Sequence, residues 1–315
     1  MRVRVLGSAA GGGFPQWNCG CFNCRGVRDG SLATRARTQE SVAVSADGEH
    51  WFLLNASPEV RAQIESFAPL HPRGSRQSPI AGIVLTNGDL DHCLGLLCLR
   101  ESHPLRVYAT ERVRCGFTEN NSMYATLQRF PGHTTWPDLK LGQPRELCRA
   151  DGGPSGLSVE AVALPGQPPL HLKRQFGEAQ PEDNVGLKIR EAGSGASLAY
   201  FPGCARVTAS VLAAVADVDC LFFDGTFWSD DELIALGLGD RRAEDMAHVP
   251  IGTGSGSLAA FARSNVRRRY FIHINNTNPI LREDSAERHA VQQAGWHVAY
   301  DGLEVGLDGH EGGAA

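Results

Sequence analysis

The sequence has neither a long apolar run nor an excess of positive charge. No stretch of its 315 residues approaches the roughly 18 consecutive apolar residues of a membrane-spanning helix. The opening segment, MRVRVLGSAAGGG, lacks the apolar core of roughly 7–15 residues that is typical of a secretory signal. A formal net charge of −5 leaves no basic surface for nucleic acid. We therefore expect a cytoplasmic protein with no membrane or nucleic-acid partner.

Clustered cysteines are also few. Six of the nine cysteines are scattered singly, mostly among apolar residues, as free buried thiols would be in a reducing cytoplasm. The other three, Cys19, Cys21 and Cys24, lie within six residues and suit a soft tetrahedral metal such as Zn²⁺. The alternative is a chance cluster of buried thiols. The glycine-rich surroundings offer little core, so we predict a structural zinc loop over residues 17–24.

Strand patterns occur in two runs, each followed by helical patterns. Two sheets packed face to face, with helices outside, satisfy this order. We therefore expect an α/β protein with one large domain over residues 1–308 and a disordered tail over 309–315. The expected strands cover residues 1–6, 41–45, 51–55, 83–85, 107–109, 158–164, 184–189, 198–201, 220–223, 270–274 and 296–300. The expected helices cover residues 208–215, 257–264 and 283–294.

Three connecting segments have informative sequences. Asp47-Gly48 predicts a tight hairpin turn between two strands, and Ser57-Pro58 predicts a helix start with Ser57 as N-cap. Residues 7–13 are glycine-rich, but no phosphate-loop lysine or helix follows them. We interpret them as a loop that passes close beneath a site. Residues 166–183 are rich in proline, glutamine and charge, and predict a long loop.

The most informative stretch is residues 83–96, IVLTNGDLDHCLGL. A short apolar strand ends in a polar cluster over residues 86–92, and an apolar segment follows. Polar side chains at the end of a strand are a common way to build a site on a rigid scaffold. Asp91 and His92 offer an oxygen and an imidazole nitrogen, which divalent first-row metals accept.

This stretch resembles the metal signature of the metallo-β-lactamase superfamily, which is His-x-His-x-Asp-His after a strand. Asp91 and His92 match the Asp-His pair, whereas Asn87 and Asp89 replace the two early histidines. In that superfamily the early histidines help to hold one metal, and the Asp-His pair with a final histidine holds the second. The resemblance implies a weakened first site, a retained second site and an αββα sandwich with its site along one edge of the sheets.

Later positions extend the resemblance. His273 matches the last metal histidine, Asp224 a later acidic position near the site, and His248 a turn that lines the pocket. His171 falls near the third histidine of the first site. Cys204 stands where the superfamily has an aspartate that bridges two metals, which argues against an ordinary dinuclear hydrolase. Whether His171 or Cys204 contributes to the site stays open.

A phosphodiesterase branch of the superfamily carries a similar Cys-x-Cys-x-x-Cys zinc site. Its fourth ligand is a histidine three residues after the last active-site histidine. That position here is Asn276, a weak zinc ligand, so the fourth zinc ligand stays open. We count Asn276 instead among the expected ligands of the active-site metal.

The retained residues favour iron. Two imidazoles and a carboxylate, from His92, His273 and Asp91, form the ligand set of non-haem iron(II) oxygenases when open positions remain. We therefore predict Fe²⁺ at the active site and dioxygen as a co-substrate. Asp89 or His248 would move protons or orient the substrate. Asp224 is expected as an additional ligand or as support for the ligands.

Four motifs together resemble a family that acts in pyrroloquinoline quinone biosynthesis. They cover residues 17–21, 86–92, 223–227 and 273–279, and the similarity extends from about Val3 to Leu307. The resemblance implies an iron- and oxygen-dependent hydroxylase that adds oxygen to the tyrosine ring of a Glu–Tyr cross-linked precursor. The alternatives are a dinuclear metal-dependent hydrolase of the phosphodiesterase type and a non-catalytic carrier that helps to export the cofactor. The oligomeric state, including a homodimer, and the number of oxygen atoms inserted stay open.

Overall fold

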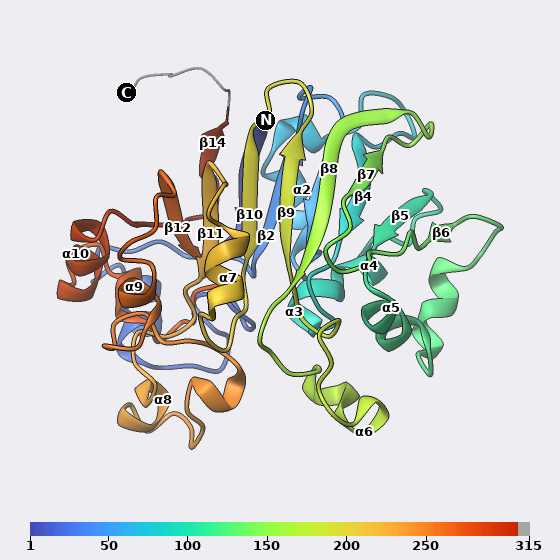
Figure 1. Cartoon of the computed structure of the whole chain (residues 1–315). Helices are drawn as coiled ribbons and strands as arrows, with labels where there is room; N and C mark the ends of the chain where they lie inside the picture. The colour runs from blue at the N-terminus through green and yellow to red at the C-terminus, as the bar shows by residue number, and fades with distance from the viewer. Residues whose placement is uncertain (308–315) are drawn as a thin grey trace.

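The computed structural model describes residues 1–307, so the tail expected over 309–315 lies outside the described residues. Two seven-stranded sheets pack face to face, and helices cover their outer faces (Figure 1). Both sheets contain parallel and antiparallel neighbours. The expected αββα sandwich is confirmed.

The first sheet is built mainly from the N-terminal half and closed by a strand from the C-terminal end. In sheet order its strands are β14 (Glu304–Gly306), β1 (Arg2–Gly7), β2 (Ser41–Ser45), β3 (Trp51–Leu54), β4 (Ile80–Val84), β5 (Leu105–Tyr108) and β6 (Thr134–Thr135). The second sheet contains β13 (His297–Val298), β12 (Arg268–Ile272), β11 (Cys220–Asp224), β10 (Ser197–Phe201), β9 (Val185–Glu191), β8 (Pro154–Ala163) and β7 (Arg145–Cys148).

The helices are short. The α-helices are α1 (Phe22–Asp29), α2 (Val60–Glu65), α3 (Leu90–Cys93), α4 (Gly95–Cys98), α5 (Glu111–Thr118), α6 (Lys173–Phe176), α7 (Ala209–Ala214), α8 (Glu232–Ala235), α9 (Ser257–Ala260) and α10 (Ala286–Gln293). The 3₁₀ helices are η1 (Ala68–Leu70), η2 (Ser122–Leu127), η3 (Leu170–Leu172), η4 (Glu244–Met246) and η5 (Pro279–Leu281). No described helix is long and apolar enough to cross a bilayer.

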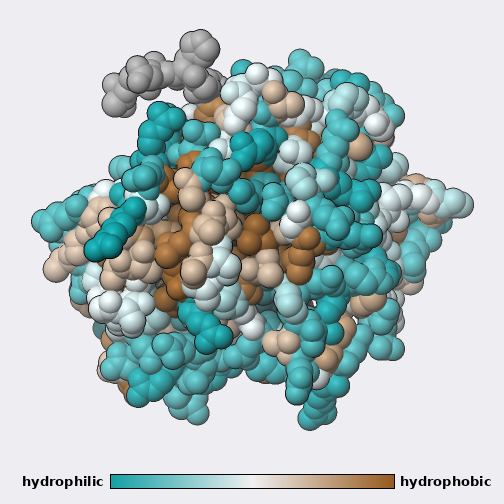
Figure 2. Space-filling model, in the orientation of Figure 1, coloured by the Kyte–Doolittle hydropathy of each residue, from teal (hydrophilic) through white to brown (hydrophobic). Residues whose placement is uncertain are grey.

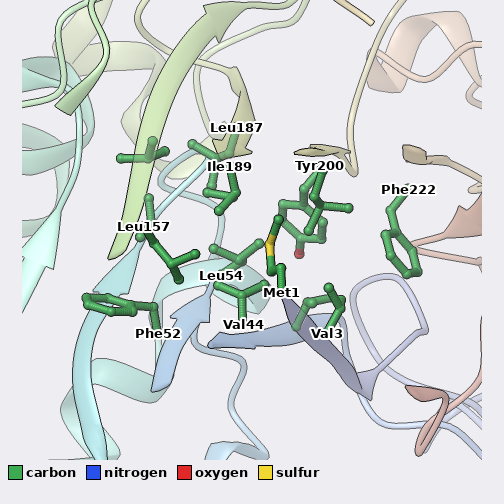
Figure 3. Packing of buried hydrophobic residues seen from close by; sticks show 14 of the residues in the cluster. Met1, Val3, Val44, Phe52, Leu54, Leu157, Leu187, Ile189, Tyr200 and Phe222 are labelled. Carbon is green, nitrogen blue, oxygen red and sulfur yellow. The ribbon is translucent and has the colours of Figure 1, made fainter. Parts of the chain in front are cut away.

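The main core lies between the two sheets. Phe52 and Leu54 from the first sheet pack in one cluster with Leu187, Tyr200 and Phe222 from the second (Figure 3). All five are fully excluded from solvent. Burying a side chain of this size stabilises a fold by about 1.5–3 kcal/mol, so this layer is a rigid base for the loops at the sheet edge. On the face that Figure 2 shows, hydrophilic residues cover most of the surface, and hydrophobic residues gather near its centre.

Most predicted strands are confirmed. The differences lie in segments whose sequence shows no clear strand or helix pattern. The strands β6, β7 and β14 and the helices α1, α5 and α8 were not predicted. Helix α2 begins at Val60 with Glu59 as N-cap, so the prediction of Ser57 as N-cap is wrong. Ser57 is buried, and its hydroxyl donates to Gln63 Oε1 at 3.0 Å. The loop predicted over residues 166–183 contains η3 and α6.

The hairpin predicted around Asp47-Gly48 is confirmed, since β2 and β3 pair antiparallel. Asp47 Oδ1 accepts the backbone N–H groups of Glu49 and His50, each at 2.8 Å, and Oδ2 lies 2.7 Å from His50 Nδ1. Burial opposes ionisation, but these hydrogen bonds hold the pKa of Asp47 below its ordinary value of 3.8. Gly48 supplies the left-handed φ of 77° that the turn requires.

Asp47→Ala tests this turn. Because the Asp47 side chain is 41% exposed, we expect the free energy of unfolding to fall by only about 1 kcal/mol at pH 7. A carboxylate whose pKa is lowered by folding stabilises the protein above its unfolded pKa and loses that effect as pH falls. The difference between wild type and Asp47→Ala should therefore shrink below about pH 4. Denaturant unfolding at several pH values, with exposed Asp240→Ala as control, measures it. An equal loss at every pH would contradict the carboxylate's role.

Candidate functional site

The three residues expected to hold the catalytic metal come from different sheets and meet at one edge. Asp91 and His92 lie in α3, which follows β4 of the first sheet, and His273 directly follows β12 of the second. Figure 1 shows α3 at the lower edge of the sandwich. The glycine-rich loop also approaches this point, because a Cβ added to Gly11 would lie 3.3 Å from Asp91 Oδ2. A loop close beneath the site is what the sequence predicted.

The donor atoms converge on one point. Asp91 Oδ2 lies 3.1 Å from His273 Nε2 and 3.6 Å from His92 Nε2. One ligand atom from each of the three residues lies within 4.8 Å of the others. The buried Nε2 of His92 has no hydrogen-bond partner among the described residues. A buried, unpaired imidazole nitrogen beside a carboxylate fits a divalent metal ion, since an unpaired polar atom is otherwise costly to bury.

Two threonines orient the histidine rings. The Thr226 hydroxyl lies 2.7 Å from Asp224 Oδ1, to which it donates, and 2.8 Å from His273 Nδ1, from which it accepts. Thr86 Oγ1 lies 3.1 Å from His92 Nδ1. Each Nδ1 is thus engaged by a threonine, and each Nε2 is left for a metal. Neither threonine was predicted as a site residue, although Thr86 lies in the motif of residues 86–92 and Thr226 in that of residues 223–227.

The backbone at the site is strained at two non-glycine residues. His273 has a φ of 58° and Asn55, at the end of β3, has a φ of 62°. A left-handed conformation costs a residue with a Cβ about 1–2 kcal/mol, and such strain clusters at functional sites. At Asn55 the conformation is supported by hydrogen bonds, because its Oδ1 accepts the Thr86 N–H at 2.9 Å.

The charges at the site suit metal binding. Burial lowers the pKa of His92 to about 4, so this imidazole is neutral at pH 7. Burial opposes ionisation of Asp91, but His92 and His273 nevertheless hold its pKa well below the ordinary range. A neutral imidazole and an ionised carboxylate are the protonation states that bind metal ions.

Asp224 supports the site from behind. Its Oδ2 accepts from Cys204 N at 2.9 Å and from His248 Nδ1 at 2.7 Å, and its Oδ1 accepts from Thr226 N at 3.0 Å as well as from the Thr226 hydroxyl. Both oxygens are therefore engaged by hydrogen bonds. Burial disfavours the protonated form of His248, but the neighbouring Asp224 carboxylate raises the pKa of this histidine. The His248 ring stacks on that of His273, with centroids 5.3 Å apart.

A polar pocket adjoins this centre. His248 and Asp89 line it together with the exposed cations Lys173 and Arg241. Because the Nδ1 of His248 binds Asp224, its Nε2 is the nitrogen left for the pocket. Burial and the neighbouring Asp91 charge raise the pKa of Asp89 to about 6. The pocket therefore combines two groups able to move protons with two cations.

His171 and Cys204, whose contribution to the site was left open, both lie outside the metal centre. His171 lines a different cavity with Leu90 and Cys93. The Cys204 thiol donates to the Arg206 carbonyl at 3.1 Å, and burial raises its pKa to about 12. Neither belongs to a group of potential metal ligands within residues 1–307.

Glu40, a fully buried carboxyl group beside His92, was not predicted from the sequence. Its Oε2 lies 3.5 Å from His92 Nε2 and accepts from Asn55 Nδ2 at 3.1 Å. Burial raises its pKa to about 8. The one available signal was a charged residue directly before the buried strand β2, a position where a solvent-exposed strand end is the more common interpretation.

The three clustered cysteines form a potential metal site separate from the two groups of potential ligands at the sheet edge, which are Asp91, His92 and His273, and Asp224, His248 and His273. One sulfur from each of Cys19, Cys21 and Cys24 lies within 4.8 Å of the others. Asn276 Nδ2 lies 3.2, 3.7 and 3.3 Å from these three sulfurs in that order. Our assignment of Asn276 to the active-site metal is therefore corrected, because its amide lies against the thiols. Rotating the amide by 180° would instead present its oxygen to an ion held by the cysteines. Asn23, in α1, fixes this loop by donating to the Asn276 carbonyl at 3.1 Å.

Comparison with known proteins is consistent with this geometry. Residues 50–274 match the β-lactamase superfamily domain. The chain is 47% identical to coenzyme PQQ synthesis protein B of Methylorubrum populi, over 98% of this chain and 100% of that protein. It is 44% identical to the protein of the same name from Gluconacetobacter diazotrophicus, over 96% of this chain and 98% of that protein.

Solved structures of similar proteins have the same fold. The crystal structure of Zn(2+)-bound PqqB from Methylobacterium extorquens has a TM-score of 0.90 and 44% identity, covering 98% of this chain and 100% of that one. A diphosphatase of the PhnP family has a TM-score of 0.66 at 20% identity, with 98% of each chain covered, and shares the fold alone.

Cys21→Ser tests the structural role of the cysteine cluster. We expect zinc retention to weaken more than about 100-fold, with a loss of stability near 2.7 kcal/mol, because binding energy at such a site is folding energy. Zinc content by mass spectrometry and the melting temperature measure both effects. Cys115→Ser, a half-buried thiol in α5, is the control. An unchanged melting temperature for Cys21→Ser would remove the structural-zinc interpretation.

Proposed function

This chain belongs to the β-lactamase superfamily and to the family of coenzyme PQQ synthesis protein B, and from that membership we propose a specific activity. We propose an iron(II)- and dioxygen-dependent hydroxylase that adds oxygen to the tyrosine ring of a Glu–Tyr cross-linked precursor of pyrroloquinoline quinone. The convergence of Asp91, His92 and His273 carries this proposal. Asn87 and Asp89 stand where a dinuclear hydrolase of this superfamily would need histidines.

Asp91, His92 and His273 would hold iron(II), through Asp91 Oδ2 and the two Nε2 atoms that the threonines leave free. Iron(II) with open positions supplies dioxygen binding and electron transfer when it is bound. The donor set fits this ion, because two imidazole nitrogens and one carboxylate oxygen converge, and His92 Nε2 has no hydrogen-bond partner in the described chain.

His248 and Asp89 are the proton-handling groups in this proposal. The ionised Asp224 fixes His248 through Nδ1, so Nε2 is available to take the phenol proton of the substrate. Asp89, whose pKa of about 6 lies close to the physiological range, is placed to return a proton to the pocket. Asp224 acts as a positioning residue for His248.

Lys173 and Arg241 give the pocket its specificity in this proposal. A precursor built from glutamate and tyrosine carries carboxylates, and cations at the pocket lining favour them. Lys173 Nζ is held by Gln167 Oε1 at 2.8 Å. These contacts would orient the substrate with its tyrosine ring toward the metal.

We also propose that the protein acts in the cytoplasm. The nine cysteines are free thiols, which agrees with a reducing cytoplasm, and iron(II) is stable in such a compartment. A homodimer stays a prediction without a test among these observations. The hydrolase alternative is weakened because hydrogen bonds already engage both oxygens of Asp224.

The decisive experiment is oxygen uptake by anaerobically iron(II)-loaded protein that is given the Glu–Tyr cross-linked dipeptide. Inserting one oxygen atom and releasing the other as water consumes two electrons and two protons, so ascorbate is supplied as reductant. We expect uptake together with a product whose mass rises in oxygen increments.

His92→Ala is the matched variant in this assay. It should abolish iron binding and uptake, because one of the two imidazole ligands is gone, and keep the cysteine-bound zinc. Turnover by His92→Ala would remove this residue from the mechanism. No uptake by iron-loaded wild type would favour a carrier, and two catalytic metals with phosphodiester cleavage would favour a hydrolase.

Arg241→Ala tests substrate orientation. We expect the KM for the dipeptide to rise about 3- to 10-fold with kcat nearly unchanged, since a solvent-exposed cation contributes about 1 kcal/mol. The effect should diminish at high salt. Arg242→Ala is the control, because the Arg242 guanidinium pairs with Asp230 at 3.0 Å. Equal KM values for the two variants would exclude carboxylate recognition by Arg241.

A further inference from the structure

We propose that Glu40 is a fourth protein ligand of the active-site metal, so that the centre holds two histidines and two carboxylates. This inference rests on the proposed metal site at Asp91, His92 and His273 and adds a ligand that neither the sequence motifs nor the relatives' names assign. Glu40 precedes β2, far in sequence from the other three residues. Its backbone N–H donates to Ala9 O at 2.8 Å, which ties it to the glycine-rich loop beneath the site.

The distances around His92 Nε2 carry the argument. This nitrogen lies 3.5 Å from Glu40 Oε2 and 3.6 Å from Asp91 Oδ2. Both separations are too long for a hydrogen bond, and His92 Nε2 has no other partner in the described chain. Two ligand atoms that share an ion at about 2.1 Å lie about 3.0–3.4 Å apart at octahedral to tetrahedral angles. Each carboxylate therefore lies at nearly the spacing from His92 that a shared ion sets. Glu40 is outside the group of ligand atoms that all lie within 4.8 Å of one another, so its side chain would shift toward Asp91 and His273 on metal binding.

The second oxygen of Glu40 supports the same conclusion. Oε1 is buried and has no hydrogen-bond partner within residues 1–307, while Oε2 accepts only from Asn55 Nδ2 at 3.1 Å. Asn55 in turn contacts Thr86, the threonine that orients His92. The carboxylate is thus held in place on one side and is unsatisfied on the side of the site. Burying an ionised, unpaired carboxylate beside a second one is unfavourable, and either a proton on Glu40 or a cation between the two groups relieves it.

A second carboxylate changes what the centre can do. Two carboxylates balance the charge of a divalent ion, which lets the site bind it away from water. Asp91, His92, His273 and Glu40 would hold the ion, and a fourth protein ligand would reduce the access of water to it.

Metal binding by full-length protein tests the inference. The catalytic metal is removed with a chelator, and cobalt(II) is titrated while its visible absorption is recorded. Iron(II) affinity is measured anaerobically by chelator competition. Glu40→Gln should weaken binding of both metals at least about 100-fold and shift the cobalt(II) spectrum, because an anionic ligand has been replaced by a neutral amide.

Glu232→Gln is the matched control. Glu232 is also buried, but both its oxygens accept hydrogen bonds, from Thr277 Oγ1 and from Trp228 N at 2.7 Å. This variant should bind cobalt(II) like wild type. The metal-free form of Glu40→Gln should not melt below metal-free wild type, since an unpaired carboxylate has been removed. A merely structural glutamate would give the opposite result.

The outcomes separate the two proposals. Wild-type affinity and an unchanged cobalt(II) spectrum in Glu40→Gln would overturn the ligand role of Glu40 and leave the hydroxylase proposal standing. Equal cobalt(II) binding by wild type and His92→Ala would overturn the metal centre itself. If Glu40→Gln fails to fold, Glu40→Asp takes its place, and its shorter side chain should also weaken binding about 10-fold or more.

Discussion

The contact between Asp91 and His273 is the interaction on which the candidate site depends. These residues belong to different sheets and are 182 positions apart, yet Asp91 Oδ2 lies 3.1 Å from His273 Nε2. The contact forms at the edge because the two sheets share a buried hydrophobic core that fixes the ends of their strands. Two carboxylates and two imidazoles crowd there with few hydrogen bonds among them. Such crowding is unfavourable for the apo fold, and a bound cation would offset it.

At the ends of β12 and β3, regular strand pairing and the side-chain positions of the site require different backbone conformations. Regular pairing stabilises the strands, whereas the site requires side chains to leave them at unusual angles. His273 and Asn55 resolve this conflict by adopting left-handed backbone conformations directly after β12 and β3. Hydrogen bonds between each Nδ1 and a threonine, Thr226 for His273 and Thr86 for His92, then hold the two imidazoles in one orientation. The rigid core supplies the stability that makes this local strain affordable.

How much the sequence predicted depended on how local each signal was. Asp91 and His92 adjoin a strand end in one motif, and His273 ends an apolar strand, so their placement followed from pattern and resemblance. The local signal at Glu40, a charged residue directly before a strand, is ambiguous, because its burial depends on contacts with Asn55 and the loop at Ala9 that only the fold creates. Helix α1 escaped notice for a related reason: its Cys21 N-cap accepts from Cys24 N, so residues that suggested only a zinc loop also begin a helix. Asn276 was misplaced because sequence spacing alone cannot separate two neighbouring metal sites.

Asp224 shows how a carboxylate at a metal site can acquire another role through its hydrogen bonds. A carboxylate has about four lone-pair positions, and Asp224 receives hydrogen bonds from Cys204 N, His248 Nδ1 and both donors of Thr226. Ligation would require Asp224 to release at least one of these donors at a buried position. It therefore fixes the ring of His248, and through Thr226 that of His273. Glu40 is the opposite case, since it has one donor, one unpaired oxygen and a histidine nitrogen at 3.5 Å. Counting donors at each buried carboxylate thus distinguishes a supporting group from a ligand, which distance alone would not do.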